Sequence, residues 1–488
     1  MAGKKKNFVC KKNFIFAYLT YIINSNVMSL IKSISGIRGT IGGRPSEGLS
    51  PIDVVKFTSA FATFLQRKSP DKRLTMVVGR DARVSGDMVD HLVVGTLVGM
   101  GVDVIETGLS TTPTTEMSVI DSGADGGIII TASHNPGHWN ALKLLNAQGE
   151  FINADEGGEV LRLAESDEIE YAEADRLGVV TYDDRAIDKH IARVLALPLV
   201  DVKAIKKAGY RIVVDAVNST GGIAIPRLLS ALGVKKVIEL NCAPTGRFAH
   251  NPEPIPQNLS EIAEAVVQNK CDLGIVVDPD VDRLALVCED GRMFGEEYTL
   301  VSVADYVLSN QQGNTVSNLS SSRALRDITS KYDGCNYYAS AVGEVNVTTM
   351  MKKYDAVIGG EGNGGVIYPE LHYGRDALVG VALFLSQMAK RGITASALRR
   401  GYPNYVITKN RKDLTPDIDV DELLERVAAK YVGQEGCEVS TVDGVKIDFK
   451  DGWVHLRKSN TEPIIRIYSE AAKEDRANEL AQMVMSEL

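Results

Sequence analysis

The sequence predicts an α/β protein with three tandem α/β mixed-sheet domains and a smaller C-terminal α+β domain around a central cleft. The chain has 488 residues, which is too many for one hydrophobic core. Apolar strand-like runs alternate with helical segments in three successive stretches, and in each stretch one strand ends in an unusual polar loop. After Pro403 the pattern changes to alternating strands between charged helices, which is typical of an α+β module.

The composition is that of a globular protein. Hydrophobic residues make up 44% and charged residues 24% of the chain, and the mean hydropathy is -0.05. The net charge is -9 and no basic run occurs after residue 12, which argues against nucleic acid as a partner. The six cysteines are far apart and show no metal-binding spacing, so we expect reduced thiols in a cytoplasmic protein.

The sequence of residues 1–27 indicates an N-terminal extension, which we expect to be poorly ordered. A lysine-rich start is followed by an apolar run over 14–23, which imitates the charged and apolar regions of a signal peptide. The run is too short to span a bilayer, and no small-x-small cleavage pattern follows it. We therefore expect no membrane association.

The first domain, predicted over residues 28–185, contains the loop around which the chain is organised. The apolar run 127–130 predicts a buried strand, and the polar turn Thr131-Ala-Ser-His-Asn-Pro136 follows it. Ser133 thus lies at the carboxyl end of a strand, where open α/β sheets bind ligands, and is a candidate nucleophile or phosphate carrier. A turn that only bonds its own backbone is the alternative. Two glycines bracket Arg38 and allow close approach to a ligand, although a solvated arginine on a surface hairpin fits equally well.

The remaining elements of the α/β part are expected in regular order. We predict strands at 74–78, 102–106 and 142–145, a helix over 86–99, and an acidic, helical bridge over 151–205. The second domain, 186–294, has strands at 210–215, 237–240, 273–277 and 284–287, and the third, 295–403, has strands near 316, 337–341 and 356–358 and a long helix after Gly374. The fourth domain, 404–488, has strands at 405–408 and 445–456 and helices near 421–431 and after 473.

The loop Asp278-Pro-Asp-Val-Asp-Arg283 predicts a metal site. Asp278, Asp280 and Asp282 alternate directly after a buried strand, and carboxylates packed so closely raise one another's pKa unless a hard cation separates them. Oxygen ligands without histidine or cysteine favour Mg²⁺ over Zn²⁺. A solvated acidic turn is the alternative, but the apolar flanks argue against it.

Two further loops carry polar groups suited to a sugar phosphate. Glu361 and Asn363 lie in the glycine-rich segment 359–365, which we interpret as a flexible loop that grips sugar hydroxyls; an ordinary glycine turn is the alternative. The segment Arg457-Lys-Ser-Asn-Thr-Glu-Pro-Ile-Ile-Arg466 offers cations, hydroxyls and backbone N–H groups for a phosphate dianion, or is a charged loop between strands.

These four loops, in this order and at this spacing, resemble those of the α-D-phosphohexomutase superfamily. The resemblance covers residues 28–488 and is strongest to the phosphoglucosamine mutase branch. It implies a phosphoserine at Ser133, Mg²⁺ held by Asp278, Asp280 and Asp282 together with the seryl phosphate, and monomers or homodimers that act on hexose phosphates and bisphosphates. The other residues that it places in the site are Arg38, Lys143 and His134 near the transferred phosphate, Arg283 beside the metal, Glu361 and Asn363 at the sugar, and Arg457, Ser459, Asn460 and Thr461 at the distal phosphate.

The sequence departs from the family pattern at one position. Many bacterial members have a histidine where this chain has Gly365, so an acid/base role for that histidine cannot be transferred. His372 lies nearby in sequence and is a candidate substitute.

The implied reaction moves phosphate between O6 and O1 of a hexose, and we expect glucosamine 6-phosphate to be converted to glucosamine 1-phosphate. Phosphomannomutase/phosphoglucomutase activity is the second hypothesis. A non-catalytic sugar-phosphate binding protein is suggested only by Gly365, and intact Ser133 and aspartates argue against it. A metal-dependent phosphatase would need a nucleophile in the metal loop, where Pro279 and Val281 leave no evident place for one.

Overall fold

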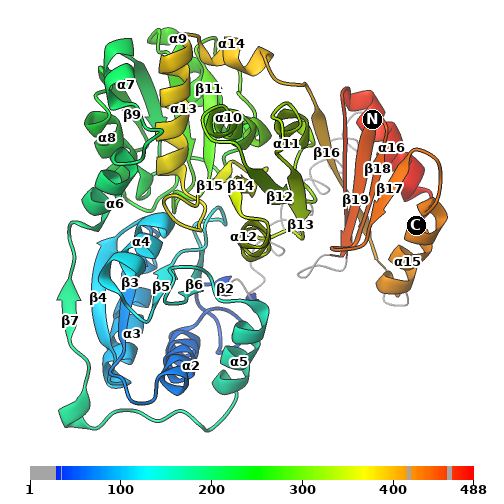
Figure 1. The fold of residues 1–488 in the computed structure, drawn as a ribbon. Coiled ribbons are helices and arrows are strands. Elements are labelled where there is room, and N and C mark those ends of the chain that lie inside the picture. The colour runs from blue at the N-terminus through cyan, green and yellow to red at the C-terminus, as the bar shows by residue number, and fades with distance from the viewer. Residues whose placement is uncertain (1–28, 34–35, 415–418, 459–463, 488) are drawn as a thin grey trace, which may run out of the picture.

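A computed structural model describes residues 29–33, 36–414, 419–458 and 464–487. Four β-sheets organise these residues, and they confirm the predicted fold class. Figure 1 shows the first unit in blue and cyan below the second and third, in green and yellow, with the orange and red fourth unit beside the third. The extension predicted over 1–27 lies outside the described residues, and the domain limits at 185, 294 and 403 stay predictions.

The first sheet has the strand order β1-β2-β6-β5-β3-β4-β7 and is mixed. Its parallel strands β5, β3, β4 and β7 continue into antiparallel pairs of β5 with β6, β6 with β2 and β2 with β1. The elements of this unit are β1 Leu30–Ser33, β2 Gly36–Thr40, α2 Pro51–Lys68, β3 Thr75–Arg80, α3 Gly86–Gly99, β4 Asp103–Leu109, α4 Thr112–Ser122, β5 Gly126–Ile130, β6 Trp139–Leu145, α5 Ala154–Ala164 and β7 Val180–Tyr182.

Strand β7 is a difference from the sequence prediction, which gave only an acidic, helical bridge over 151–205. The strand pairs in parallel with β4 and closes one edge of the first sheet. Its three residues are half-buried or exposed, so they show no apolar run that could indicate a strand.

The second and third sheets repeat one pattern at smaller size. Their strand orders are β11-β10-β8-β9 and β13-β12-β14-β15, each with parallel strands and one antiparallel edge strand. The second unit contains α6 Ala186–Leu195, α7 Val202–Ala208, β8 Arg211–Asp215, α8 Gly221–Ala231, β9 Lys236–Leu240, α9 Ser260–Gln268, β10 Leu273–Val277 and β11 Leu284–Cys288. The third contains α10 Glu296–Leu308, β12 Asn314–Asn318, α11 Ala324–Thr329, β13 Tyr337–Ser340, α12 Glu344–Lys353, β14 Ala356–Glu361, β15 Gly365–Ile367, α13 Ala377–Arg391 and α14 Ala395–Arg400.

Helices α10 and α13 pack together at the centre of a core that joins the second and third units. Helix α13 is apolar and buried over most of its length, and it is capped by the preceding Asp376, whose carboxylate accepts hydrogen bonds from the N–H groups of Leu378 and Val379. This shared core holds the two units against each other.

The fourth unit is an antiparallel sheet with two helices. Its strand order is β16-β20-β19-β18-β17. The elements are β16 Val406–Asp413, α15 Val420–Tyr431, β17 Cys437–Ser440, β18 Val445–Phe449, β19 Gly452–Lys458, β20 Ile464–Ala471 and α16 Glu474–Met485. Its core is separate from those of the other units.

Each predicted site loop connects a strand to an antiparallel partner. The Ser133 loop joins β5 to β6, the aspartate loop joins β10 to β11, the Glu361 segment joins β14 to β15, and residues 459–463 join β19 to β20. In the first three units that strand also pairs with a parallel neighbour, so the loop lies at the carboxyl edge of the parallel strands.

Among the described residues, no helix is long and apolar enough to cross a membrane.

Candidate functional site

The Ser133 loop is held by a buried arginine that sequence reasoning did not single out. Ser133 has a φ of +48°, a conformation that non-glycine residues rarely adopt. Arg83 donates hydrogen bonds to the carbonyl oxygens of Ser133, Asn135, Pro136 and Trp139, and its Nε lies 3.0 Å from Asp81. The arginine thus fixes the whole loop and offsets the strain at Ser133.

The loop brings Ser133 against the aspartate loop of the second unit. The side chain is buried, and its hydroxyl donates a 2.8 Å hydrogen bond to Oδ2 of Asp278. In the aspartate loop, Val281 has a φ of +65°, which is strained for a β-branched residue. That turn directs Asp278, Asp280 and Asp282 to one side.

The three aspartates fit a divalent cation. One oxygen of each carboxylate lies within 4.8 Å of the others, and all three side chains are buried. Oδ1 of Asp280 and Oδ1 of Asp282 have no hydrogen-bond partner among the described residues, so they are available as ligands. Burial, together with the charges of Asp282 and Asp280, raises the pKa of Asp278 well above its ordinary value.

Lys143 supplies positive charge to this group from strand β6. Its Nζ lies 2.7 Å from Oδ2 of Asp280 and 3.5 Å from Oδ2 of Asp282. Burial alone would lower the pKa of Lys143, but the two aspartates outweigh it and the pKa is raised, so the ammonium stays charged. Thr112 donates a further hydrogen bond to Asp280, which fastens the metal loop to helix α4 of the first unit.

Arg375 joins the metal loop to the sugar loop, and the sequence analysis missed it. Its guanidinium contacts three buried carboxylates: Asp282 at 2.7 Å, Glu361 at 2.9 Å and Glu344 at 2.9 Å. Burial opposes ionisation of Glu361, but Arg375 and other partners hold its pKa below the ordinary value. Glu361 also accepts a hydrogen bond from Asn318, so it is fixed before any ligand arrives.

Arg375 explains the glycine at position 365. A Cβ at Gly365 would lie 2.4 Å from Cδ of Arg375, so the arginine occupies the space that a larger residue would need. Glu361 is the last residue of β14 and pairs with Gly365 of β15. The glycine-rich segment therefore forms a hairpin, whereas the sequence analysis expected a flexible loop. The hairpin pairing explains the difference.

His372 lies in a different environment. Its ring is buried between Glu116 and Asp376, at 3.3 and 3.5 Å, and it does not line the cleft described next. The structure therefore gives no support to His372 as a substitute for the absent histidine.

A cavity of about 680 Å³ lies in front of these loops and receives residues from all four units. Ser29, Ile31, Arg38, His134, Asn135 and Trp139 come from the first unit and Glu253 and Arg283 from the second; Lys409, Arg466 and Tyr468 are among those from the fourth. The third unit contributes Glu296, Glu297, Asn318, Ser320, Ser321, Val342, Glu361, Gly362 and Asn363.

The wall beside Ser133 is positively charged. Arg38 donates to Asn135 at 2.9 Å, and Arg283 has a buried Nε without a hydrogen-bond partner among the described residues. Burial and these two arginines lower the pKa of His134 to about 2, so its imidazole is neutral at physiological pH. Such a wall suits an anionic group.

From the fourth unit, Arg466 of the predicted phosphate segment lines the cavity together with Lys409, which the sequence analysis did not single out. Arg457 lies 2.8 Å from Asp443 and does not line the cavity, whereas Lys409 and Arg466 do. Ser459, Asn460 and Thr461 lie outside the described residues. Lys409 and Arg466 stand on neighbouring strands β16 and β20, a pairing that sequence alone does not show.

The chain matches one family over almost its whole described length. Residues 30–170, 188–291 and 295–405 match phosphoglucomutase/phosphomannomutase α/β/α domains I, II and III, and residues 407–487 match the C-terminal domain of the same family. The chain belongs to the phosphoglucomutase/phosphomannomutase family. The predicted resemblance is thereby confirmed, and with it the assignment as an enzyme that isomerises hexose phosphates.

Named relatives fall in two groups. A phosphoglucomutase/phosphomannomutase from Thermococcus kodakarensis is 36% identical over 91% of this chain and 96% of its own length. A phosphoglucosamine/phosphogalactosamine mutase from Sulfurisphaera tokodaii is 34% identical over 93% of this chain and 98% of its own. The crystal structure of a phosphoglucomutase/phosphomannomutase family protein from Burkholderia thailandensis superposes with a TM-score of 0.81 at 27% identity, over 94% of this chain and 98% of that one.

The buried carboxylates lead to a prediction about Asp278. Its pKa is raised in the metal-free fold, so folding takes up a proton, and metal-free stability falls as pH rises from the unfolded pKa of about 4 toward the folded one. The side chain introduced by Asp278→Asn is neutral at every pH, so the variant should not lose stability in this way as the pH rises. Scanning fluorimetry in EDTA measures this effect. The melting temperature of the variant should be higher than that of the wild type at mildly alkaline pH and close to it at acidic pH. Equal pH dependence of the two proteins would contradict the raised pKa.

A second prediction concerns Arg375. Arg375→Met should cost about 3–5 kcal/mol of unfolding free energy, because it leaves three buried carboxylates without their cation. Arg375→Lys should lose less stability but should still lower kcat, since one ammonium cannot replace the planar fork. The control is Arg292→Met at an exposed pair with Asp290, which should change stability by about 0.5 kcal/mol or less. Denaturant melts and steady-state assays measure both quantities, and a stable, fully active Arg375→Met would refute the role.

Proposed function

We propose that this enzyme preferentially interconverts glucosamine 6-phosphate and glucosamine 1-phosphate, with Mg²⁺, a phosphorylated Ser133 and a hexose bisphosphate intermediate. The observation that carries the choice of sugar is a carboxylate, Glu297, held against the sugar loop at the wall of the cavity. A cytoplasmic location and a monomeric or homodimeric state stay predictions from the sequence.

Glu297 suits an amino sugar because, in the part of the chain that the structure describes, no cation forms an ion pair with it, although the charge of Lys409 acts on it from a distance. Its side chain accepts a hydrogen bond from the N–H of Ser322, and a Cβ at Gly362 would fall 2.1 Å from both of its carboxylate oxygens. Burial raises the pKa of Glu297 to about 8, so ionisation is costly in the absence of a ligand. The ammonium of a 2-amino sugar would lower that cost, whereas a neutral hydroxyl would not.

The same region offers groups for the hydroxyls that hexoses share. Glu361 and Asn363 line the cavity next to Glu297, and the Glu361 carboxylate can accept bonds from two neighbouring hydroxyls. We assign O3 and O4 to this pair. Because glucosamine, glucose and mannose share these hydroxyls, the site should bind all three and distinguish them at C2 only.

We assign the transfer chemistry to Ser133 and the groups around it. In the first step the free sugar hydroxyl attacks phosphorus as the phosphoseryl P–O bond breaks, and the hydroxyl proton passes in net terms to the seryl oxygen, which gives the bisphosphate. After reorientation the seryl oxygen attacks the other phosphorus, the P–O bond to the sugar breaks, and the sugar oxygen takes up the proton. Lys143, Arg38 and Arg283 would neutralise the charge on the phosphoryl oxygens, and neutral His134 can hydrogen-bond them. Mg²⁺ on Asp278, Asp280 and Asp282 would add charge neutralisation when bound.

The distal phosphate requires cations on the opposite wall. Lys409 and Arg466 face the cavity from the fourth unit, and we propose that they act with Arg457, Ser459, Asn460 and Thr461 on the phosphate that is not transferred. Placing the two phosphate sites on opposite walls lets either end of the sugar face Ser133.

Phosphomannomutase/phosphoglucomutase activity is the second candidate. The Thermococcus kodakarensis relative, at 36% identity, carries that name. The two proposals differ at C2 of the sugar, so substrate preference distinguishes them.

The test of the sugar is a coupled assay with glucosamine, glucose and mannose phosphates, each primed with its own bisphosphate. Glucosamine phosphate should have the highest kcat/KM, and its advantage over glucose phosphate should grow as pH rises toward about 8, because Glu297 then ionises. Glu297→Gln should reduce that advantage by about ten- to hundredfold, the value of a charge-assisted hydrogen bond. A wild type that prefers mannose phosphate would overturn the choice of sugar.

Two neighbouring variants serve as controls in that assay. Glu296→Gln changes the adjacent carboxylate, which lies 3.2 Å from Lys409, and should leave the sugar preference as it is. Glu361→Gln should depress all three substrates together. An effect of Glu361→Gln on one sugar alone would remove Glu361 from the shared hydroxyls.

A separate prediction concerns Ser133. Intact-mass analysis of the purified enzyme should show a partly occupied phosphate that disappears in Ser133→Ala and remains in the control Ser320→Ala. Removing the phosphate should abolish turnover until a hexose bisphosphate is added, because the serine must be recharged. Phosphate mapped only to other residues would exclude Ser133 as the carrier.

A further inference from the structure

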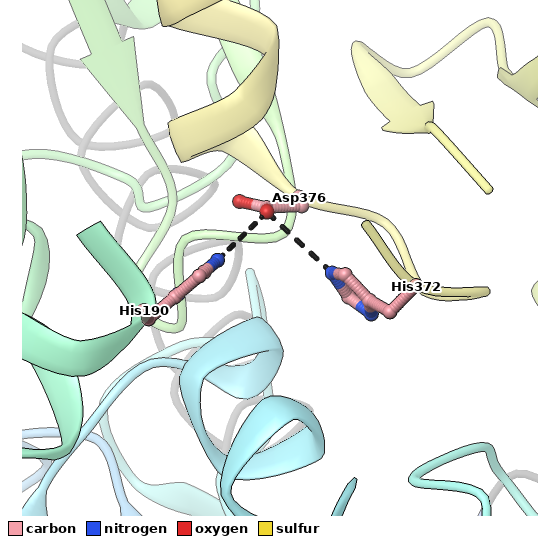
Figure 2. A group of neighbouring side chains, drawn as sticks. All are labelled: His190, His372 and Asp376. Atoms are coloured by element: carbon pink, nitrogen blue, oxygen red, sulfur yellow. Dashed lines mark hydrogen bonds and ion pairs between the residues drawn. The ribbon is translucent and has the colours of Figure 1, made fainter. Parts of the chain in front are cut away.

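A second cluster of metal-ligating side chains lies outside the cleft, where three units meet. Nε2 of His190 lies 3.0 Å and Nε2 of His372 lies 3.5 Å from the same oxygen, Oδ2 of Asp376. Figure 2 shows both imidazole rings directed at Asp376 from opposite sides. His190 stands on α6, and His372 and Asp376 belong to the turn that leads into α13. All three side chains are buried.

Hydrogen bonding within the cluster leaves several polar atoms without partners. Neither ring nitrogen of His372 and neither carboxylate oxygen of Glu116 has a hydrogen-bond partner among the described residues, although Nδ1 of His372 lies 3.3 Å from Oε2 of Glu116. Glu116 comes from α4 of the first unit and is fully buried. Burial lowers the pKa of His372, but its contacts with Asp376 and Glu116 outweigh burial and raise it to about 10, so without a metal the ring is a cation between two carboxylates. A divalent cation bound in place of that proton would balance the same buried charges.

The spacing of the ligand atoms fits a transition metal. One nitrogen of each histidine and one oxygen of Asp376 lie within 4.8 Å of one another. Bonds of about 2.0–2.1 Å in a tetrahedral zinc site place ligand atoms roughly 3.3–3.5 Å apart, close to the observed 3.0 and 3.5 Å. Two imidazoles favour Zn²⁺ or a similar first-row cation over Mg²⁺.

The groups behind the three ligands are those that a metal site needs. Nδ1 of His190 lies 2.9 Å from the hydroxyl of Thr114, and Nδ1 of His372 faces Glu116. The second oxygen of Asp376 accepts hydrogen bonds from two backbone N–H groups of α13. Metal-bound histidines and carboxylates are oriented by such partners on their far side.

We propose that His190, His372 and Asp376 bind a divalent transition-metal ion of the Zn²⁺ type, with Glu116 and Thr114 orienting the two imidazoles. The ion joins α6 to the turn that leads into α13, and α4 is held to them through Glu116 and Thr114, so the first, second and third units are fixed to one another. It is separate from the aspartate site in the cleft, and it has a structural role. A cavity of about 400 Å³, lined by His190, Met117 and Thr181 among others, lies against the cluster and provides a route for the ion.

The test measures zinc on the full-length chain. Protein stripped with EDTA is dialysed against excess Mg²⁺, loaded with Zn²⁺, desalted and analysed for metal. The wild type should retain about one Zn²⁺ per chain, and Asp278→Asn should retain it as well, because that variant alters only the cleft site. His190→Gln and His372→Gln should each lose most of it. His250→Gln, at a histidine paired with Asp215, is the control and should retain the ion.

Two further measurements keep the test decisive where a variant folds poorly. Co²⁺ should give the visible absorption of a site with nitrogen and oxygen ligands in the wild type, and Zn²⁺ should raise its melting temperature in the presence of Mg²⁺. The proposal would be overturned if the wild type retained no Zn²⁺ after dialysis against excess Mg²⁺. It would also be overturned if His190→Gln and His372→Gln both retained as much Zn²⁺ as the wild type. The cluster would then be a hydrogen-bonded junction without metal.

Discussion

The arrangement of the cleft depends on the electrostatic cost of burying three aspartates at one point. Asp278, Asp280 and Asp282 are almost completely shielded from water, and a group of like charges is stable there only if cations reach it. Lys143 reaches it from the first unit and Arg375 from the third. The α/β units are thus held in register by charge neutralisation as well as by the apolar core, and the point where they meet is the point to which we assign the phosphate chemistry.

The chain positions its site loops in the same way in each of the first three units. A strand runs to the edge of its sheet, turns through a short polar loop and returns antiparallel. Both ends of the loop are therefore fixed by sheet hydrogen bonds, so a strained backbone such as that of Ser133 or Val281 can be maintained. Rigid support of this kind lets loops hold reactive groups that would otherwise repel one another.

The fold and the loops that carry the candidate site could be predicted from the sequence, but the contacts that hold those loops together could not. Apolar runs that end in polar turns are visible in the sequence, so the strands before Ser133 and Asp278 were predicted correctly. Arg83 and Arg375 were missed, because their partners come from loops far away in the chain and an arginine by itself indicates nothing. Arg457 and Arg466 occur in the same segment and are paired across β19 and β20, and only the structure shows that Arg457 is engaged by Asp443 while Arg466 lines the cavity.

The burial of Ser133 has a consequence for how the enzyme could be controlled. Only 4% of the residue is accessible, and its hydroxyl points at Asp278 inside the cleft. A protein kinase or phosphatase would have to unfold the loop to reach that oxygen, whereas the cavity of about 680 Å³ lined by the neighbouring His134 and Asn135 has room for a small molecule such as a sugar bisphosphate. If Ser133 carries the phosphate, then the fraction of competent molecules follows the cellular concentration of that metabolite. The activity of the enzyme would in that case follow the concentration of the bisphosphate without any dedicated signalling protein.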